Sequence, residues 1–431
     1  MTHLRRARRG RGPINATVVV PGSKSAANRA LIIAALAPGT TTLTGVPSGD
    51  DVIACLDGLR DMGISVNVDA DVVVIEGGSL GSHPVTVNAR LAGTTSRFLT
   101  ALGALRESPL TITGDAALRA RPMAPLHDAL VSLGFTVDRQ PDGFGLPVTV
   151  SRPPERMIGH HVRLPGDVSS QFVSALMMIA PQLPSGLTIE LDGPRVSESY
   201  IHMTASIMST FGAQVDVSDN VVQIRHGEYV ARRFAIEPDF SSAAFPIAAV
   251  VIAGGRVRVP GLASASLQGD SRILDIAVSM GADVEVDDND VVVSRSADVE
   301  VKAIDVDMSD CSDLVPAVAM MCATASGTST LTGVGFIRHK ESDRLGDLAA
   351  ELREIEARVD VLADGLVIHG VDSLGAGRCE THHDHRLAMA LSLAALTADY
   401  VDVCDSDVVS KSWPEYWESM SDIIGSEATT S

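Results

Sequence analysis

The sequence predicts an α/β protein in which six similar units form two domains of three. Three observations support this prediction. A pattern of strand, polar loop, helix, glycine and two short Val-rich strands repeats at a spacing of roughly 70 residues. A helix that is apolar on every side precedes each copy of the pattern. The strands alternate apolar and polar residues, as in sheets that pack one face on helices and expose the other.

The repeat is clearest in two copies that begin at Pro38 and Ser326, where the segments PGTTTLTGV and SGTSTLTGV are closely similar. Further copies begin at Ser185 and Gly254, and a looser copy begins at Ser108. The last copy is truncated and runs from about residue 399 to residue 424.

The helices that precede the repeats consist almost entirely of Ala, Leu, Ile, Val and Met. A helix with no polar face is buried, so each unit supplies one interior helix and one outer amphipathic helix. The six apolar segments are residues 30–37, 98–105, 172–180, 245–253, 314–323 and 387–396.

Composition restricts the function. The 431-residue chain is 45% apolar but only 3% aromatic, and its formal net charge is −20. This charge argues against nucleic acid and an anionic membrane as partners. The longest apolar runs are too short to span a membrane, and the five cysteines match no zinc or redox spacing. We therefore expect a cytoplasmic enzyme with reduced thiols.

The start of the chain, residues 1–12, carries five arginines. No apolar stretch of signal-peptide length follows, so export is not expected. We expect this segment to be a frayed basic tail.

The residues just before the apolar helices are strongly polar. They read PGSKSAANR, AGTTSR, GDVSSQ, EPDFSS, SDCSD and HHDHR. Helix capping explains the Ser, Thr and Asp residues but not the long side chains of Lys24, Arg29, Arg97, Gln171 and Arg386. Helix starts also favour phosphate and carboxylate, so six of them in one register predict an anion site.

A second polar set lies between strand and outer helix. In RHKESDR, Lys340 and Arg344 are four residues apart and Glu341 precedes Arg344 by three, so all three can share one helix face. That face is either an ion-paired surface or part of the site. The plausible titrating groups are Lys24, Asp313, Glu341 and His385.

In this order, the stretches PGSKSAANRALIIAALA, AGTTSR, RARPM, GDVSSQFVSAL, SESYI, KESDRL and DHRLAMA, followed by Lys411, resemble the 5-enolpyruvylshikimate-3-phosphate (EPSP) synthase family from about Pro13 to the C-terminal helix. The resemblance implies an inside-out α/β barrel type of fold, in which sheets and outer helices surround buried helices. It implies a discontinuous domain of residues 1–20 and 240–431, an inserted domain of residues 21–239, and an active site in the cleft between them that closes on substrate.

The resemblance also implies transfer of the enolpyruvyl group of phosphoenolpyruvate to the 5-hydroxyl of shikimate 3-phosphate, with release of phosphate through a tetrahedral intermediate. This is a step of the shikimate pathway, in chorismate and aromatic amino acid biosynthesis. It implies no metal or organic cofactor, and we expect a monomer.

The residues are carried over by motif. The implied catalytic residues are Lys24, Asp313 and Glu341, with individual roles open. The implied shikimate 3-phosphate site comprises Lys24, Ser25, Arg29, Ser169, Ser170, Gln171, Ser197, Tyr200, Asp313 and Lys340. The implied phosphoenolpyruvate site comprises Lys24, Gly93, Arg121, Gln171, Arg344, Arg386 and Lys411.

Two positions depart from the family pattern, because Leu91 and Phe336 stand where Asn is often found. The nearest alternative is the sister enzyme that transfers enolpyruvyl to a UDP-amino sugar, which often has a reactive Cys where this chain has Ala116. A non-enzymatic repeat scaffold would not explain Lys and Arg at buried helix starts. RNA-end chemistry on a related fold conflicts with the net charge.

Overall fold

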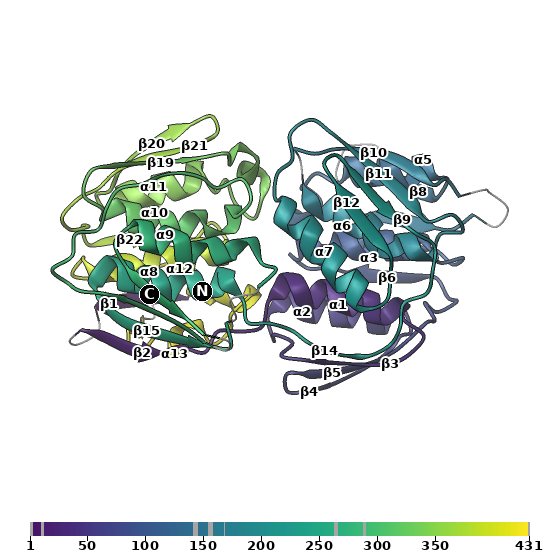
Figure 1. Ribbon diagram of the computed structural model, residues 1–431, viewed down its shortest axis with the longest axis horizontal. Coiled ribbons are helices and arrows are strands. Elements are labelled where there is room, and N and C mark those ends of the chain that lie inside the picture. The colour runs from purple at the N-terminus through teal and green to yellow at the C-terminus, as the bar shows by residue number, and fades with distance from the viewer. Residues whose placement is uncertain are drawn as a thin grey trace. The chain divides into compact units, whose positions relative to one another are not determined.

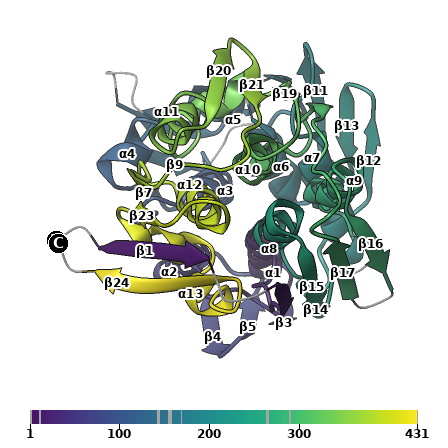
Figure 2. The ribbon, with the colours of Figure 1, turned by 90° about the vertical axis from the view of Figure 1, so that its left-hand side faces the viewer.

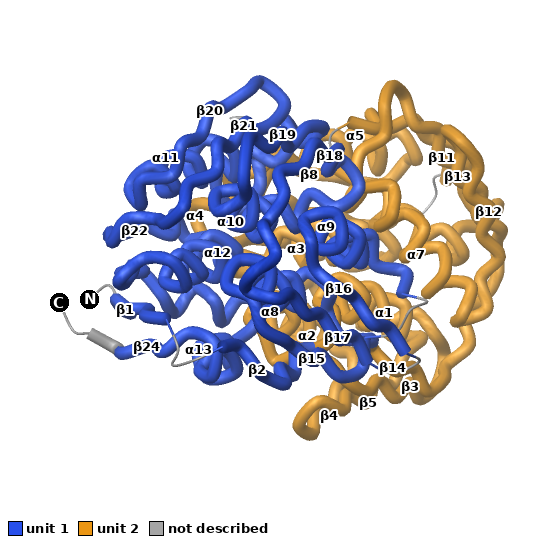
Figure 3. The backbone as a smooth tube through the Cα atoms, turned by 60° about the vertical axis from the view of Figure 1, so that its left-hand side comes forward, with its two compact units in different colours: residues 1–21, 237–431 blue, residues 22–236 orange. Residues whose placement is uncertain are grey.

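The computed structural model of the chain describes residues 3–9, 13–140, 145–153, 158–167, 169–262, 266–287 and 290–429. These residues form two compact units, coloured separately in Figure 3: unit 1 is residues 1–21 and 237–431, and unit 2 is residues 22–236. The boundaries expected from the sequence were residues 20 and 240.

The described residues of each unit form three four-stranded sheets, and these six sheets have the same topology. In every sheet an edge strand pairs parallel with its neighbour, and the other two pairings are antiparallel. The repeated sequence pattern therefore corresponds to one repeated structural unit, which confirms the predicted fold class.

Each sheet has a fixed order of strands from one edge to the other. The sheets of unit 2 are β14 (Arg233–Ala235), β3 (Gly39–Thr44), β5 (Val72–Gly77) and β4 (Ser65–Asp69); β6 (Val85–Asn88), β7 (Leu110–Thr113), β9 (Val148–Ser151) and β8 (Thr136–Arg139); and β10 (His161–Pro165), β11 (Leu187–Asp192), β13 (Val221–Ile224) and β12 (Val215–Ser218). The sheets of unit 1 are β16 (Asp283–Val286), β17 (Asp290–Arg295), β15 (Gly255–Pro260) and β2 (Ile14–Thr17); β18 (Asp305–Asp307), β19 (Thr328–Thr332), β21 (Gly365–His369) and β20 (Arg358–Leu362); and β22 (Gly377–Cys379), β23 (Val401–Val403), β1 (Leu4–Arg9) and β24 (Ile424–Thr429).

Three helices form the interior of each unit, and their side chains are almost all buried, as their uniform apolarity predicted (Figure 1). The interior helices are α1 (Lys24–Leu36), α3 (Gly93–Ala104) and α6 (Ser170–Ile179) in unit 2, and α8 (Phe240–Ala253), α10 (Val315–Ala323) and α12 (His385–Ser392) in unit 1. In unit 1 these helices pack on one another at the centre, and the three sheets surround them (Figure 2).

The outer helices are amphipathic or short. They are α2 (Asp50–Asp61), α4 (Ala116–Arg119), α5 (Ala124–Leu133) and α7 (Glu198–Thr210) in unit 2, and α9 (Ile273–Ser279), α11 (Gly346–Glu354) and α13 (Tyr416–Ser419) in unit 1. Short 3₁₀ segments are η1 (Ala180–Gln182), η2 (Gly269–Arg272), η3 (Ser312–Leu314), η4 (Gly335–His339), η5 (Leu393–Leu396) and η6 (Ser406–Lys411). No helix among the described residues is both long and apolar enough to cross a membrane.

In two sheets the edge strand does not come from the segment just before that repeat's own interior helix. Strand β2 precedes α1 in the sequence but pairs with β15 of unit 1, whereas β14 precedes α8 but pairs with β3 of unit 2. The chain therefore enters unit 2 at Gly22 and leaves it after Ile236. Because β2 belongs to unit 1 although it precedes all of unit 2 in the chain, unit 1 is discontinuous in sequence.

The expectation of a frayed basic tail was wrong for residues 4–9. These residues form β1, which lies between β23 and β24 and completes the sixth sheet (Figure 2). Leu4 and Ala7 are buried, and Arg6 forms a bidentate pair with Asp402 at 2.7 Å for each bond while its guanidinium lies 4.2 Å from the ring centre of Tyr400. The last repeat appeared truncated in the sequence because its missing strand comes from the other end of the chain.

Candidate functional site

The first interior helix of unit 2 begins with a charged pair. The side chain of Ser23 caps α1 by accepting a hydrogen bond from the amide of Ala26, and Lys24 follows as the first helical residue. Lys24 Nζ lies 3.1 Å from Asp51 Oδ2, and these side chains are 14% and 4% exposed. Asp51 is not among the residues predicted from the sequence, because an acid in the first turn of α2 indicates only a favourable helix start.

Arg29 lies one helical turn further along α1, and its side chain is almost completely buried. Its guanidinium donates to Thr204 Oγ1 at 2.6 Å, Ser174 Oγ at 3.0 Å and the carbonyl of Ser25 at 2.9 Å. The ring centres of Phe98 and Tyr200 lie 5.3 and 5.6 Å from its Cζ atom. No carboxylate of the described residues pairs with it, so burial lowers the pKa of Arg29 to about 10.

A second arginine group lies at the starts of α3 and α6. Arg97 Nη1 donates to Gln171 Oε1, and its guanidinium lies 5.3 Å from the ring centre of Phe172. A Cβ atom on Gly93 would lie 2.9 Å from nitrogen atoms of both Arg97 and Arg121. Glycine at this position therefore leaves room for two cationic side chains that the sequence places in separate motifs.

Further predicted residues of unit 2 lie at the starts of α6 and α7. Ser169 caps α6 by accepting from the amide of Gln171 at 3.3 Å, and Ser170 is buried beside it. Ser197, the residue before α7, is buried and has a positive φ of 56°. A non-glycine residue rarely adopts this conformation, and such strain is concentrated at functional sites.

Asp313 organises the predicted residues of unit 1. Its Oδ1 atom accepts from Lys340 Nζ at 2.6 Å and from Arg344 Nη1 at 2.8 Å, and its Oδ2 atom accepts from Arg386 Nη2 at 2.9 Å. Burial alone would raise the pKa of Asp313, but Arg386, Lys340 and Arg344 together hold it well below its usual value. The carboxylate is therefore ionised.

Glu341 belongs to the same cluster as Asp313, because both carboxylates accept hydrogen bonds from Arg344. It accepts from Arg344 Nη2 at 2.9 Å and from Lys411 Nζ at 3.2 Å. Burial alone would lower the pKa of Arg344, but the carboxylates of Asp384, Glu341 and Asp313 raise it instead. Lys340, Glu341 and Arg344 of RHKESDR therefore belong to a largely buried network. Arg338 and Asp343 of the same motif form a separate, partly exposed ion pair.

Asp384 is a second residue that the sequence analysis left out of the site. It is completely buried, caps α12 through the amide of Arg386 at 2.9 Å, and accepts from Arg344 Nε at 2.6 Å and Nη2 at 3.2 Å. Its position before the helix suggested only a cap, so its bond to a distant arginine could not be seen. Asp384 fixes the orientation of Arg344 and the start of the helix that carries Arg386.

Asp270 lies in the same part of unit 1 and is buried, with Ser241 Oγ donating to it. Burial raises the pKa of Asp270 to about 7, with a further contribution from the nearby Asp313 carboxylate. His385, which we had predicted to titrate, is completely buried in the first turn of α12. Phe336, one of the two departures from the family pattern, has its ring centre 5.7 Å from Lys340 Nζ.

Replacing Asp270 with Asn is expected to stabilise the protein at pH 8 more than at pH 5. Between about pH 4 and pH 7 the folded chain keeps a proton on Asp270 that the unfolded chain loses, so wild-type stability falls by about 1.4 kcal/mol per pH unit in this window. Urea unfolding at both pH values measures the difference between variant and wild type. Asp275→Asn, an exposed change on α9, is the control. An Asp270→Asn effect that does not change between pH 5 and pH 8 would contradict the assignment.

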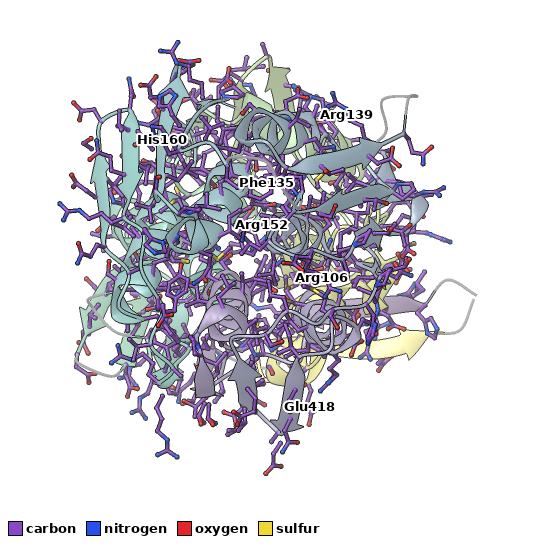
Figure 4. All side chains as sticks on the ribbon, turned by 90° about the vertical axis from the view of Figure 1, so that its right-hand side faces the viewer. Arg106, Phe135, Arg139, Arg152, His160 and Glu418 are labelled. Atoms are coloured by element: carbon purple, nitrogen blue, oxygen red, sulfur yellow. The ribbon has the colours of Figure 1, made fainter. Side chains whose placement is uncertain are left out.

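Unit 2 has a separate cavity of about 410 Å³ at the far ends of α1 and α3. Leu36, Gly78, Arg106 and Arg152 are among its lining residues, and Figure 4 labels both arginines. None of the predicted site residues lines it. Among the described residues, no group of three or more His, Cys, Asp or Glu side chains is arranged to hold a metal ion.

Comparisons with known proteins give a consistent result. The family model described as EPSP synthase (3-phosphoshikimate 1-carboxyvinyltransferase) matches residues 8–420. A 3-phosphoshikimate 1-carboxyvinyltransferase of Methanothermobacter thermautotrophicus is 37% identical over 413 residues, which are 96% of each chain. The enzyme of the same name from Trichormus variabilis is 35% identical over 96% of this chain and 97% of its own. A solved EPSP synthase from Acinetobacter baumannii has a TM-score of 0.81 at 25% identity, covering 98% of this chain and 100% of that one.

Proposed function

The chain belongs to the EPSP synthase family, and we propose that it transfers the enolpyruvyl group of phosphoenolpyruvate to the 5-hydroxyl of shikimate 3-phosphate and releases phosphate. The observation that carries this proposal is the concentration of buried cations in a chain of net charge −20. A buried cation is costly unless it is paired, and Arg29 pairs with no carboxylate of the described residues. An anionic ligand would supply the missing charge.

We assign the predicted site residues to the two substrates by residue type. Serine hydroxyls and backbone amides at helix starts suit the 3-phosphate, and the carboxylate of Asp313 suits ring hydroxyls. Shikimate 3-phosphate binds Lys24, Ser25, Arg29, Ser169, Ser170, Gln171, Ser197, Tyr200, Asp313 and Lys340. Guanidinium groups bind phosphate and carboxylate through paired hydrogen bonds. Phosphoenolpyruvate binds Lys24, Gly93, Arg121, Gln171, Arg344, Arg386 and Lys411.

The reaction needs one proton donor and one proton acceptor. In the addition step a proton is added to the methylene carbon of phosphoenolpyruvate, and the 5-hydroxyl loses its proton as its oxygen attacks the adjacent carbon. In the elimination step the tetrahedral intermediate loses a proton from the new methyl group and releases phosphate, which takes up the hydroxyl proton. The cations hold the two anions together and stabilise the charge on the departing phosphate. The same steps require no metal or organic cofactor.

The pKa of Asp313 narrows the assignment of the proton transfers. Because its neighbours hold this pKa well below the usual value, Asp313 is a carboxylate and can accept a proton but has none to donate. Because Asp313 is also the carboxylate that we expect to contact the ring hydroxyls, we assign it as the acceptor of the 5-hydroxyl proton. Lys24 and Glu341 remain the candidates for donating the proton to the methylene carbon.

The sugar-nucleotide branch of the fold is the second candidate. In this chain Ala116 begins α4, and all five cysteines are buried elsewhere in the structure. No thiol is therefore available at the position where that branch often has a reactive Cys. We also propose that the enzyme is cytoplasmic, which its free cysteines support and cell fractionation can test. We propose that it is a monomer, which light scattering can test.

Purified protein is expected to release phosphate from phosphoenolpyruvate when shikimate 3-phosphate is present, and not when either substrate is omitted. Replacing Arg386 with Met is expected to lower kcat/KM by about 100-fold or more, because a charge-assisted contact to phosphoenolpyruvate is lost. Arg258→Met is the matched control, since Arg258 is an exposed arginine on β15 that pairs with Asp290. Phosphate release with a UDP-amino sugar and not with shikimate 3-phosphate would overturn the proposal.

A further inference from the structure

Arg29 is held by neutral groups alone. Its guanidinium has five N–H donors, and the described residues accept three of them: Thr204 at Nε, Ser174 at Nη2 and the carbonyl of Ser25 at Nη1. One N–H then remains on each terminal nitrogen. Two such donors are what a bidentate contact with a carboxylate or phosphate needs.

The two hydroxyl groups come from different helices, because Ser174 lies on the interior helix α6 and Thr204 lies on the outer helix α7. Their oxygens are 2.8 Å apart, and Thr204 Oγ1 donates to the carbonyl of Tyr200 at 2.7 Å. The Thr204 proton is thereby used, so Ser174 must donate to Thr204. Both hydroxyls are then left with lone pairs that accept from Arg29, and the direction of every bond in this network is determined.

This arrangement has a clear electrostatic consequence. A carboxylate in place of the two hydroxyls would hold the guanidinium equally well but would neutralise it. Hydroxyl groups fix its orientation and leave its positive charge available to a ligand. Both hydroxyl residues are completely buried, so water does not compete for these bonds.

We propose that Ser174 and Thr204 are positioning residues that orient Arg29 towards an anionic group of shikimate 3-phosphate without neutralising it. This inference rests on the proposed function of the chain. It assigns to the two hydroxyls a role in substrate affinity that acts through Arg29.

The test replaces Thr204 with Val, which has nearly the same shape but no hydroxyl. The KM for shikimate 3-phosphate is expected to rise about 10- to 100-fold, because a hydrogen bond to a charged group is lost. The KM for phosphoenolpyruvate and kcat are expected to change less than about threefold. Thr204→Ser keeps the hydroxyl and is expected to restore the KM for shikimate 3-phosphate. Ser174→Ala is expected to change it in the same direction as Thr204→Val.

Thr210→Val is the matched control on the same helix. Its hydroxyl also bonds to the carbonyl four residues earlier, that of Ser206 at 3.0 Å, but Arg29 is not among its partners. The kinetic constants of this variant are expected to equal those of wild type. If the loss of a threonine hydroxyl acted only by destabilising α7, the kinetic constants would change in both Thr204→Val and Thr210→Val.

A double-mutant cycle tests whether Thr204 acts through Arg29. In an Arg29→Met background, Thr204→Val is expected to cause no further rise in the KM for shikimate 3-phosphate. Additive effects, or an unchanged KM in Thr204→Val, would overturn the inference while leaving the proposed function intact. Absence of wild-type turnover with shikimate 3-phosphate would overturn both.

Discussion

Replacing Arg29 with Met is expected to weaken the binding of shikimate 3-phosphate by about 100-fold or more and to leave the free protein no less stable than wild type. The binding loss follows because two charge-assisted hydrogen bonds to the ligand disappear. Stability is retained because a buried cation without an anion is itself destabilising. The hydroxyls of Ser174 and Thr204 stay partnered with each other after the change. Calorimetric titration and thermal unfolding measure the two effects.

Arg106→Met is the control, because Arg106 is a buried arginine of unit 2 that we expect to stabilise the fold and not to bind a ligand. It is also buried, but its guanidinium donates to the backbone carbonyls of Met62, Leu80, His83 and Ser108. Arg106→Met leaves these carbonyls without their donor, so it is expected to lower the melting temperature and leave ligand binding unchanged. If Arg29→Met lowered stability as much as Arg106→Met and left binding unchanged, Arg29 would be a structural residue.

Replacing Asp313 with Asn is expected to lower kcat by about 1,000-fold or more. A lost general base accounts for about 100- to 10,000-fold by itself, and Lys340, Arg344 and Arg386 also lose the anion that they share. For the second reason we also expect the free energy of unfolding to fall by about 3–5 kcal/mol. Steady-state kinetics well below the melting temperature separate the loss of rate from the loss of stability.

The pH dependence gives a further check on Asp313. Its pKa is depressed in the folded protein, so its contribution to stability is fully present above the unfolded pKa of about 4 and is lost as pH falls through the folded value. The difference in stability between wild type and Asp313→Asn is therefore expected to be the same at pH 6 and pH 8. Asp305→Asn, an exposed change on β18, is the control for both measurements. A normal kcat in Asp313→Asn would exclude Asp313 as the base.

The interior helices could be predicted from the sequence because burial on every side leaves a local signal. Segments such as residues 30–37 and 172–180 contain no polar face, and the structure buries both almost completely. Charged residues at the starts of these helices were also visible, since Lys24 and Arg386 lie where capping alone does not require them. These signals need only a few consecutive residues to be recognised.

The partners of the charged residues could not be predicted in this way. Asp51 and Asp384 look like ordinary helix-start acids in the sequence, and only folding brings them to Lys24 and Arg344. The same holds for Thr204, which reaches Arg29 from a helix 175 residues away in the chain. Each of these contacts depends on how helices and loops far apart in the sequence pack, which no local pattern records.

The sequence by itself determined the six-fold repeat, the buried helices and the positions of the cations, because periodicity and residue type are local properties. Only the tertiary structure decided that β1 completes the last repeat, that β2 pairs with β15 and β14 with β3, and that Arg29 is held by hydroxyls and Arg344 by carboxylates. Strand pairing and the pairing of buried charges both join residues far apart in the chain. The free energy of these pairings depends on which groups meet in the dry interior. Those neighbours are determined only when the chain has folded.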